Sequence, residues 1–150
     1  MNGIMASTGA EGYTLRPGDV ERWDFHRWDF RMFTPAIVGD WPEPFLHGYG
    51  GEVRPTTVAY EPGLEAEAEM LAEALAAAGV EADVCGMELV AEEAKSFRNL
   101  ILLGTPEAPL LRELDRAWDR LGFFAHMLSL IHISEPTRPL YISYAVFCLK

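Results

Sequence analysis

Residues 99–103 read Asn-Leu-Ile-Leu-Leu, a short run that is apolar at every position after the first. A strand that is covered on both faces of a sheet has this character, because neither of its faces meets water. The run therefore predicts a buried strand, and the neighbouring elements are interpreted around it.

Strands and helices alternate on both sides of this run. Further short strands are predicted over 56–60 and 82–85, and helices over 64–78, 88–97 and 110–121. This alternation is typical of a small parallel α/β domain of three layers, which we expect over 56–127. Phe123 and Phe124 are expected to begin a fourth strand.

The helix over 64–78 has the clearest pattern. One face carries its apolar residues, and most of its glutamates lie elsewhere; the apolar set is Leu64, Ala68, Leu71 and Leu75. Gly79 follows directly and is the expected end of the helix.

Residues 1–33 have a different, β-like character. Pro17-Gly18-Asp19 is a turn signal, and it predicts a hairpin over 13–30. The second strand would place Trp23, Phe25 and Trp28 on a half-buried surface. Two strands alone cannot bury these rings, so we expect partner strands that precede Met1.

Residues 34–55 form a connector rich in proline and glycine. It also carries Trp41, Phe45, His47 and Tyr49. A connector with this many aromatic residues is expected to pack against a domain rather than to act as a flexible linker.

The composition excludes several classes of function. The 150 residues include 23 acidic and 12 basic side chains, and the resulting net charge of −11 disfavours binding to nucleic acid. Two cysteines cannot form a disulfide framework. The apolar stretch from Leu140 to Leu149 is too short to span a membrane, which takes roughly 20 residues.

No catalytic or metal-binding motif is present in the sequence. Gly104-Thr105-Pro106-Glu107 follows the buried strand, where α/β proteins bind ligands, but it lacks the glycines and lysine of a phosphate loop. We interpret it as a turn into a helix, with Thr105 as the N-cap and Pro106 as the first helical residue.

Histidines and carboxylates between residues 24 and 47 are candidates for a metal or acid–base cluster. They are Asp24, His26, Asp29 and His47, and they contain a single carboxylate–x–histidine unit. Zinc sites normally use spaced pairs of ligands, so we interpret them as an exposed polar face.

Aromatic and histidine side chains are the candidate ligand-binding residues. These are Trp23, Trp28, Trp41, His47 and Tyr49, and they lie near Phe45 among glycines and prolines. Such rings can stack on a ring-bearing ligand, or they can form a core between two domains. Both interpretations stay open at this point.

Three stretches carry a resemblance to a known family: Asn2-Gly3-Ile4, Tyr13 to Trp28 around its Pro17-Gly18-Asp19 turn, and Pro35 to Gly48. Together they resemble the closing part of the transcobalamin-like C-terminal domain family. The resemblance covers about the first fifty residues and implies the C-terminal β-hairpin of a truncated, secreted β-grasp-like module. It also implies an exported or cell-surface protein, and a corrinoid or other ring-bearing ligand.

The last residues resemble a translated sequencing adapter. A transposase-type adapter encodes Leu128 to Arg138 residue for residue, and its constant block encodes Ile142 to Leu149. We therefore interpret 128–150 as a non-native tail. We expect it either to extend away from the fold or to fill a groove through hydrophobicity alone.

Two functions follow as expectations. The first is non-catalytic ligand binding at the cell surface through the five candidate residues, with no cofactor assigned. The alternative is a structural or assembly role in the cell envelope, in which the aromatic side chains only pack two domains together.

Overall fold

Three parallel strands form the centre of the structure. The computed structural model describes residues 1–4, 6, 8–23, 40–116 and 145–147. Strands β1 (Thr56–Tyr60), β2 (Ala82–Gly86) and β3 (Asn99–Leu103) are parallel, and β4 (Ala145–Phe147) pairs antiparallel with β3, in the order β2-β1-β3-β4. This confirms the predicted α/β class.

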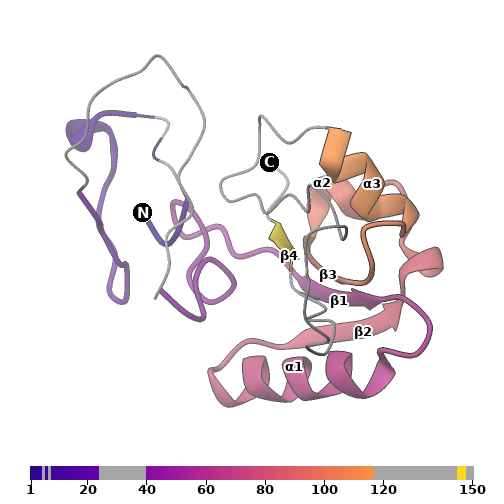
Figure 1. The fold of residues 1–150 in the computed structure, drawn as a ribbon. Helices are drawn as coiled ribbons and strands as arrows, with labels where there is room; N and C mark the ends of the chain where they lie inside the picture. The colour runs from indigo at the N-terminus through magenta and orange to yellow at the C-terminus, as the bar shows by residue number, and fades with distance from the viewer. Residues whose placement is uncertain (5, 7, 24–39, 117–144, 148–150) are drawn as a thin grey trace, which may run out of the picture.

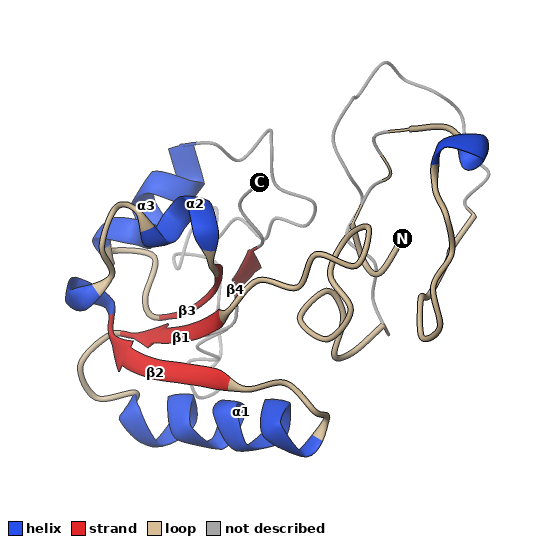
Figure 2. Ribbon diagram, turned by 180° about the vertical axis from the view of Figure 1, so that it is seen from behind, coloured by secondary structure: helices blue, strands red, loops and turns tan. Residues whose placement is uncertain are grey.

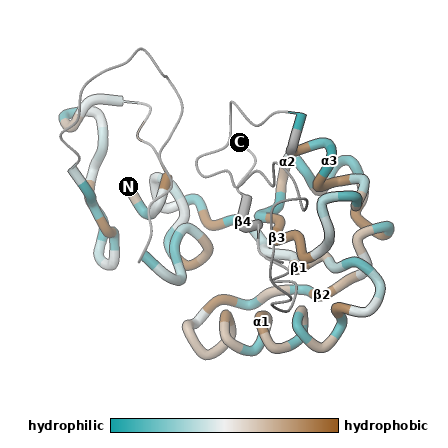
Figure 3. Tube along the Cα trace, viewed as in Figure 1, coloured by the Kyte–Doolittle hydropathy of each residue, from teal (hydrophilic) through white to brown (hydrophobic). Residues whose placement is uncertain are grey.

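Strand β3 is buried along its whole length, as its apolar run predicted. Its side chains alternate between two hydrophobic clusters, with Ile101 and Leu103 in one and Leu100 and Leu102 in the other. Helix α1 covers one face of the sheet, while α2 and α3 lie on the opposite side (Figures 1 and 2). Figure 3 marks β3 as a strongly hydrophobic stretch.

Helix α1 (Glu65–Ala77) matches the predicted helix closely. Its apolar face places Ala68 and Leu75 in the first cluster, beside Val58 of β1. Gly79 ends the helix with a φ of 89°, a left-handed conformation that glycine adopts without steric cost.

The end of α1 is a Schellman motif. The Gly79 amide donates to the Ala76 carbonyl at 3.0 Å, and the Val80 amide donates to the Leu75 carbonyl at 2.9 Å. Because Val80 and Leu75 are both buried in the first cluster, the motif carries the chain directly from the helix into β2.

One of the predicted helices is divided in the structure. The stretch expected as one helix over 88–97 is a 3₁₀ turn (Met87–Leu89) followed by α2 (Ala94–Phe97), because Val90 has an extended backbone between them. Helix α3 (Pro109–Arg116) accounts for the start of the helix expected over 110–121. Residues 117–127, with the strand expected at Phe123 and Phe124, lie outside the described part.

The described part of residues 1–33 contains the predicted turn but no strand. Gly18 has a φ of 91°, and the Asp19 amide donates to the Arg16 carbonyl at 3.1 Å. Strand pairing is replaced by Asn2, which bonds the Val20 amide and carbonyl at 2.7 and 2.8 Å. The hairpin predicted over 13–30 is therefore not found in its described half, and residues 24–33 are not described.

The connector packs against the α/β domain, as predicted. Phe45 is only 2% exposed and belongs to the first hydrophobic cluster, together with Val58, Leu75 and Val80. Leu46 packs beside it. The described residues 40–55 thus supply a side chain to the core of the following domain.

Strand β4 is the described part of the tail, and it lies at the edge of the sheet rather than in its centre. Residues 128–144 and 148–150 are outside the description, and the adapter origin stays a prediction. Among the described helices, none combines the length and apolar character needed to cross a bilayer.

Candidate functional site

Two of the five candidate residues present their rings to solvent. Trp23 is 73% exposed and Trp41 is 52% exposed. Each directly follows one member of an ion pair, in which Arg22 Nε donates to Asp40 Oδ1 at 2.7 Å. The pair fixes two distant points of the chain side by side, so the two indoles follow neighbouring backbone positions.

The Arg22–Asp40 pair has a well-defined electrostatic character. The Asp40 side chain is almost fully buried, while the Arg22 side chain is half exposed. The hydrogen bond and the charge of Asp40 raise the pKa of Arg22 above its ordinary value. The Arg22 guanidinium therefore stays charged at every physiological pH.

His47 is held by a neighbouring carboxylate. Its Nδ1 bonds Glu43 Oε1, and its backbone amide donates to Glu43 Oε2 at 3.1 Å. The Glu43 side chain is only 3% exposed. The Nε2 edge of the ring lies against Gly18, where a side chain would collide with the imidazole. These contacts hold the imidazole of His47 in the packing of the connector, so we assign His47 a structural role.

Tyr49 lies against Tyr13. Their ring centroids are 5.4 Å apart with an interplanar angle of 61°, an edge-to-face contact. The Tyr13 hydroxyl donates to Asp19 Oδ2 at 3.3 Å and accepts a hydrogen bond from the Gly50 amide at 3.2 Å. Tyr49 is therefore part of the packing between the first residues and the connector.

The fifth candidate, Trp28, lies outside the described residues. The same is true of Asp24, His26 and Asp29 from the polar cluster. In the described ranges, no three histidine, cysteine or carboxylate side chains gather in a way that would hold a metal ion.

Asn2 and Asp19 form a hydrogen-bonded centre that the sequence analysis missed. Asn2 is fully buried, and its Nδ2 donates to Asp19 Oδ1 and to the Gly48 carbonyl, both at 2.8 Å. The Arg16 amide donates to Asp19 Oδ2 at 2.8 Å. The bond from Asn2, followed by that from Arg16, lowers the pKa of Asp19 below its ordinary value.

A second contact that the sequence analysis did not predict lies at the carboxyl ends of β1 and β3. The Thr105 amide donates to Glu61 Oε2 at 2.8 Å, and the Glu61 amide donates to the Leu103 carbonyl at 2.8 Å. The prediction that Thr105 caps the helix is wrong, because α3 begins at Pro109. Glu61 thus occupies the Thr105 amide, which is then not available to bind an anion.

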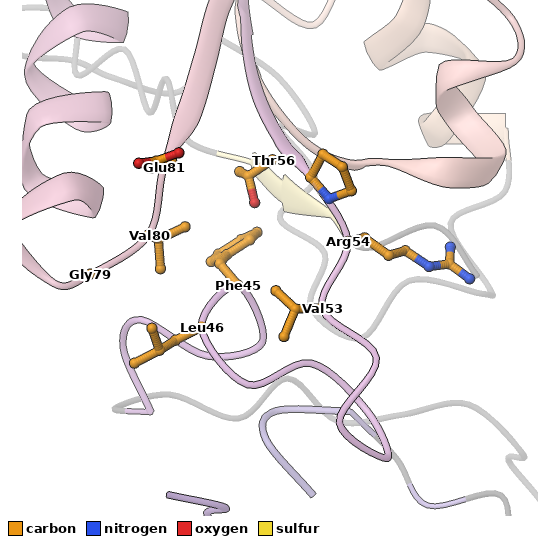
Figure 4. A pocket seen from close by; sticks show the side chains of 9 residues that line it. Phe45, Leu46, Val53, Arg54, Thr56, Gly79, Val80 and Glu81 are labelled. Carbon is orange, nitrogen blue, oxygen red and sulfur yellow. The ribbon is translucent and has the colours of Figure 1, made fainter.

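A hollow lies where the connector meets the α/β domain (Figure 4). It has a volume of about 280 Å³ and is lined by Phe45, Leu46, Val53, Arg54, Pro55, Thr56, Gly79, Val80 and Glu81. Thr56 is 2% exposed, and its Oγ1 has no hydrogen-bond partner among the described residues. A buried hydroxyl without a partner costs about 1–3 kcal/mol.

The thiol of Cys85 is not prepared for nucleophilic chemistry. Burial, followed by the charge of Glu88, raises the pKa of Cys85 above its ordinary value. The thiol is therefore protonated at neutral pH, and a protonated thiol is a poor nucleophile.

No protein-family model matches this chain, and no curated protein or solved structure matches it either. The resemblance of residues 1–50 to the transcobalamin-like family accordingly stays a prediction. Function has to be inferred from the residues of the chain itself.

Proposed function

We propose that this chain belongs to an exported or cell-surface protein with a non-catalytic role, the binding of a ring-bearing ligand such as a corrinoid. The observation that carries the proposal is the pair of exposed indoles, Trp23 and Trp41, placed next to the Arg22–Asp40 ion pair. Exposed tryptophans on an anchored backbone can stack on a ring with little loss of conformational entropy.

The other candidate residues support this role indirectly. His47 is fixed by Glu43, and Tyr49 is packed on Tyr13. Both therefore stabilise the loops that carry the indoles, rather than contacting the ligand. Among the described candidates, the proposed contact residues narrow to Trp23 and Trp41, and Trp28 stays a candidate outside the described residues.

Calorimetric titration of the 150-residue chain with cyanocobalamin tests the proposal. Trp41→Ala and Trp23→Ala should each weaken binding about tenfold, since an aromatic pair contributes roughly 0.5–1.5 kcal/mol beyond its buried area. Phe97→Ala is the matched control, because Phe97 is about as exposed as Trp23 but lies on α2. Equal binding by all three variants would contradict the assignment.

A structural or envelope-assembly role without a ligand is the second candidate. The specific observation in its favour is Phe45, an aromatic residue of the connector that is buried in the core of the α/β domain. Under this role cyanocobalamin gives no heat of binding. The aromatic side chains then affect only thermal stability, with Phe45 rather than Trp41 as the important one.

The proposed location has its own test. Intact source cells are treated with a protease and then probed with an antibody against residues 56–116. If the protein is at the surface, the protease should remove the antibody signal. A signal that persists until the cells are lysed would contradict export.

A further inference from the structure

We propose that the hollow between Phe45 and Thr56 binds a small neutral molecule with one ring and one hydrogen-bonding group. This site is separate from the exposed tryptophans, and it does not depend on the function proposed above. Its walls come from the connector, the start of β1 and the turn that ends α1.

The size of the hollow sets the size of the ligand. An apolar cavity of about 150 Å³ is enough for benzene, and the hollow has a volume of about 280 Å³. A single ring with a short substituent fits this space, whereas a corrinoid is far too large. The two proposed sites therefore take different ligands.

Apolar side chains form part of the wall of the hollow. Phe45 and Val80 are buried, Leu46 is half-buried, and Val53 is half exposed. The hollow thus presents carbon on several sides beside a few polar groups, a combination typical of sites for small organic molecules.

The Thr56 hydroxyl gives the hollow its polar point. Figure 4 shows its oxygen directed toward the ring of Phe45, and Oγ1 has no hydrogen-bond partner in the described part of the chain. Such groups normally find a partner in protein, water or ligand. Oγ1 lies beneath the surface of the hollow, so a ligand hydroxyl or carbonyl would supply the missing bond once the Phe45 ring moves slightly aside. A threonine hydroxyl both donates and accepts.

The charges at the rim favour a neutral ligand. Arg54 and Glu81 have opposite signs, so neither sign of ligand charge is selected. Arg54 also has other partners, since its Nη1 donates to the Ser96 carbonyl at 3.0 Å and its Nε lies 3.7 Å from Glu52. Figure 4 shows its side chain extending away from Phe45.

Two probes of similar shape test the site. Benzyl alcohol carries the hydroxyl that Thr56 would bond, and ethylbenzene replaces that hydroxyl with a methyl group. We expect benzyl alcohol to shift the backbone amide NMR signals of Phe45, Thr56 and Val80 in the 150-residue chain. Shift mapping on the unmodified chain does not depend on any variant folding.

Two variants sharpen the test. Thr56→Val keeps the shape of the side chain but removes the hydroxyl, so it should weaken benzyl alcohol about fivefold and leave ethylbenzene unchanged. Val53→Phe should fill part of the hollow from its lining and abolish binding of both probes. Val84→Phe is its control, because it adds the same bulk on β2, away from the hollow.

The outcomes separate clearly. Shifts confined to the hollow, lost in Val53→Phe and kept in Val84→Phe, support the proposal. Shifts that are absent, spread over the surface, or unchanged by Val53→Phe overturn it. Equal loss of both probes in Thr56→Val also overturns the role given to the hydroxyl. A crystal structure with benzyl alcohol present in which only a water bonds Thr56 Oγ1 overturns it as well.

Discussion

Different interactions stabilise the two halves of this molecule, residues 1–55 and the α/β domain that follows them. From β1 to α3, two apolar clusters lie on opposite faces of a sheet. In the described parts of 1–23 and 40–55 there is no strand, and hydrogen bonds around Asn2 and Asp19 join residues that are far apart in sequence. Burial of apolar area tolerates many substitutions of similar size, whereas a buried polar centre depends on individual atoms.

The largest effect is expected where the two halves meet, at Phe45. Phe45→Ala removes a ring that is buried in the α/β core, and it should lower the free energy of unfolding by about 3–5 kcal/mol. Urea denaturation measures this loss. Trp41→Ala is the comparison, because its ring is half exposed and should cost less than about 1 kcal/mol. Equal losses would mean that the connector does not rely on Phe45.

The next effect concerns the polar half. Asn2→Ala leaves the Gly48 carbonyl and the Val20 amide without partners, and it places alanine at a φ of 48°. The loss should be about 3 kcal/mol, roughly 2 from the hydrogen bonds and 1 from the backbone. Asn2→Gly tolerates the backbone conformation and should recover only the smaller part.

Amide exchange measures this prediction locally. The Val20 amide should exchange faster in both Asn2 variants, while the amides of β3 keep their protection. Uniformly faster exchange through β3 as well would show that the two halves do not unfold separately.

A smaller effect of opposite sign is expected at Thr56. Thr56→Val removes a buried hydroxyl that has no partner among the described residues, so the variant should be about 1 kcal/mol more stable without ligand. Thermal unfolding measures the gain. Thr57→Val is the contrasting variant, because the Thr57 hydroxyl accepts a hydrogen bond from Arg98 at 2.6 Å and its removal should destabilise the protein. A destabilised Thr56→Val would contradict the assignment.

The smallest effect is a dependence on pH. The pKa of Asp19 is lower in the folded chain than its ordinary value of 3.8, chiefly because of the hydrogen bond from Asn2. Ionised Asp19 therefore stabilises the fold above that value, and the contribution is lost as pH falls through the lower, folded-state pKa. NMR titration of the Asp19 carboxyl carbon measures this midpoint.

The Asn2→Ala variant provides the control for this titration. Without the Asn2 amide, the midpoint of Asp19 should rise toward its ordinary value. An unchanged midpoint would assign the lowered pKa to the Arg16 amide instead.

The same contrast explains what the sequence could predict. Apolar residues, among them Val58, Leu75 and Leu103, are spaced with the periods of strands and helices. The α/β elements therefore follow from the pattern of apolar residues. The division of the helix predicted over 88–97 did not, because the extended backbone at Val90 interrupts the helical pattern. The start of α3 at Pro109 rather than at Pro106 did not either, because the Ala108 amide donates to the Thr105 carbonyl in a turn before the helix. Element boundaries depend on such single residues.

The candidate site was predictable only in part. The sequence identified the aromatic residues of the connector. It could not show that Trp41 is exposed while Phe45 is buried, because no local sequence pattern distinguishes exposed from buried residues in a connector. The sequence analysis missed Asn2 because its hydrogen-bond partners lie in distant segments of the chain. It missed Thr56 because the burial of its hydroxyl also depends on contacts between distant segments. The Asn2-Gly3 dipeptide, which is typical of turns, was the available signal for Asn2.

The central position of β1 has a consequence for synthesis on the ribosome. Thr56 pairs with Ala82 on one side and with Asn99 on the other. Strand β1 is synthesised before both of these neighbours, so it leaves the ribosome without a paired strand on either side. The β1–α1–β2 unit can assemble as soon as Gly86 has left the exit tunnel, because its contacts are the more local ones. Until β3 and α3 follow, the face around Ala59 has no cover, and the nascent chain presents it to chaperones.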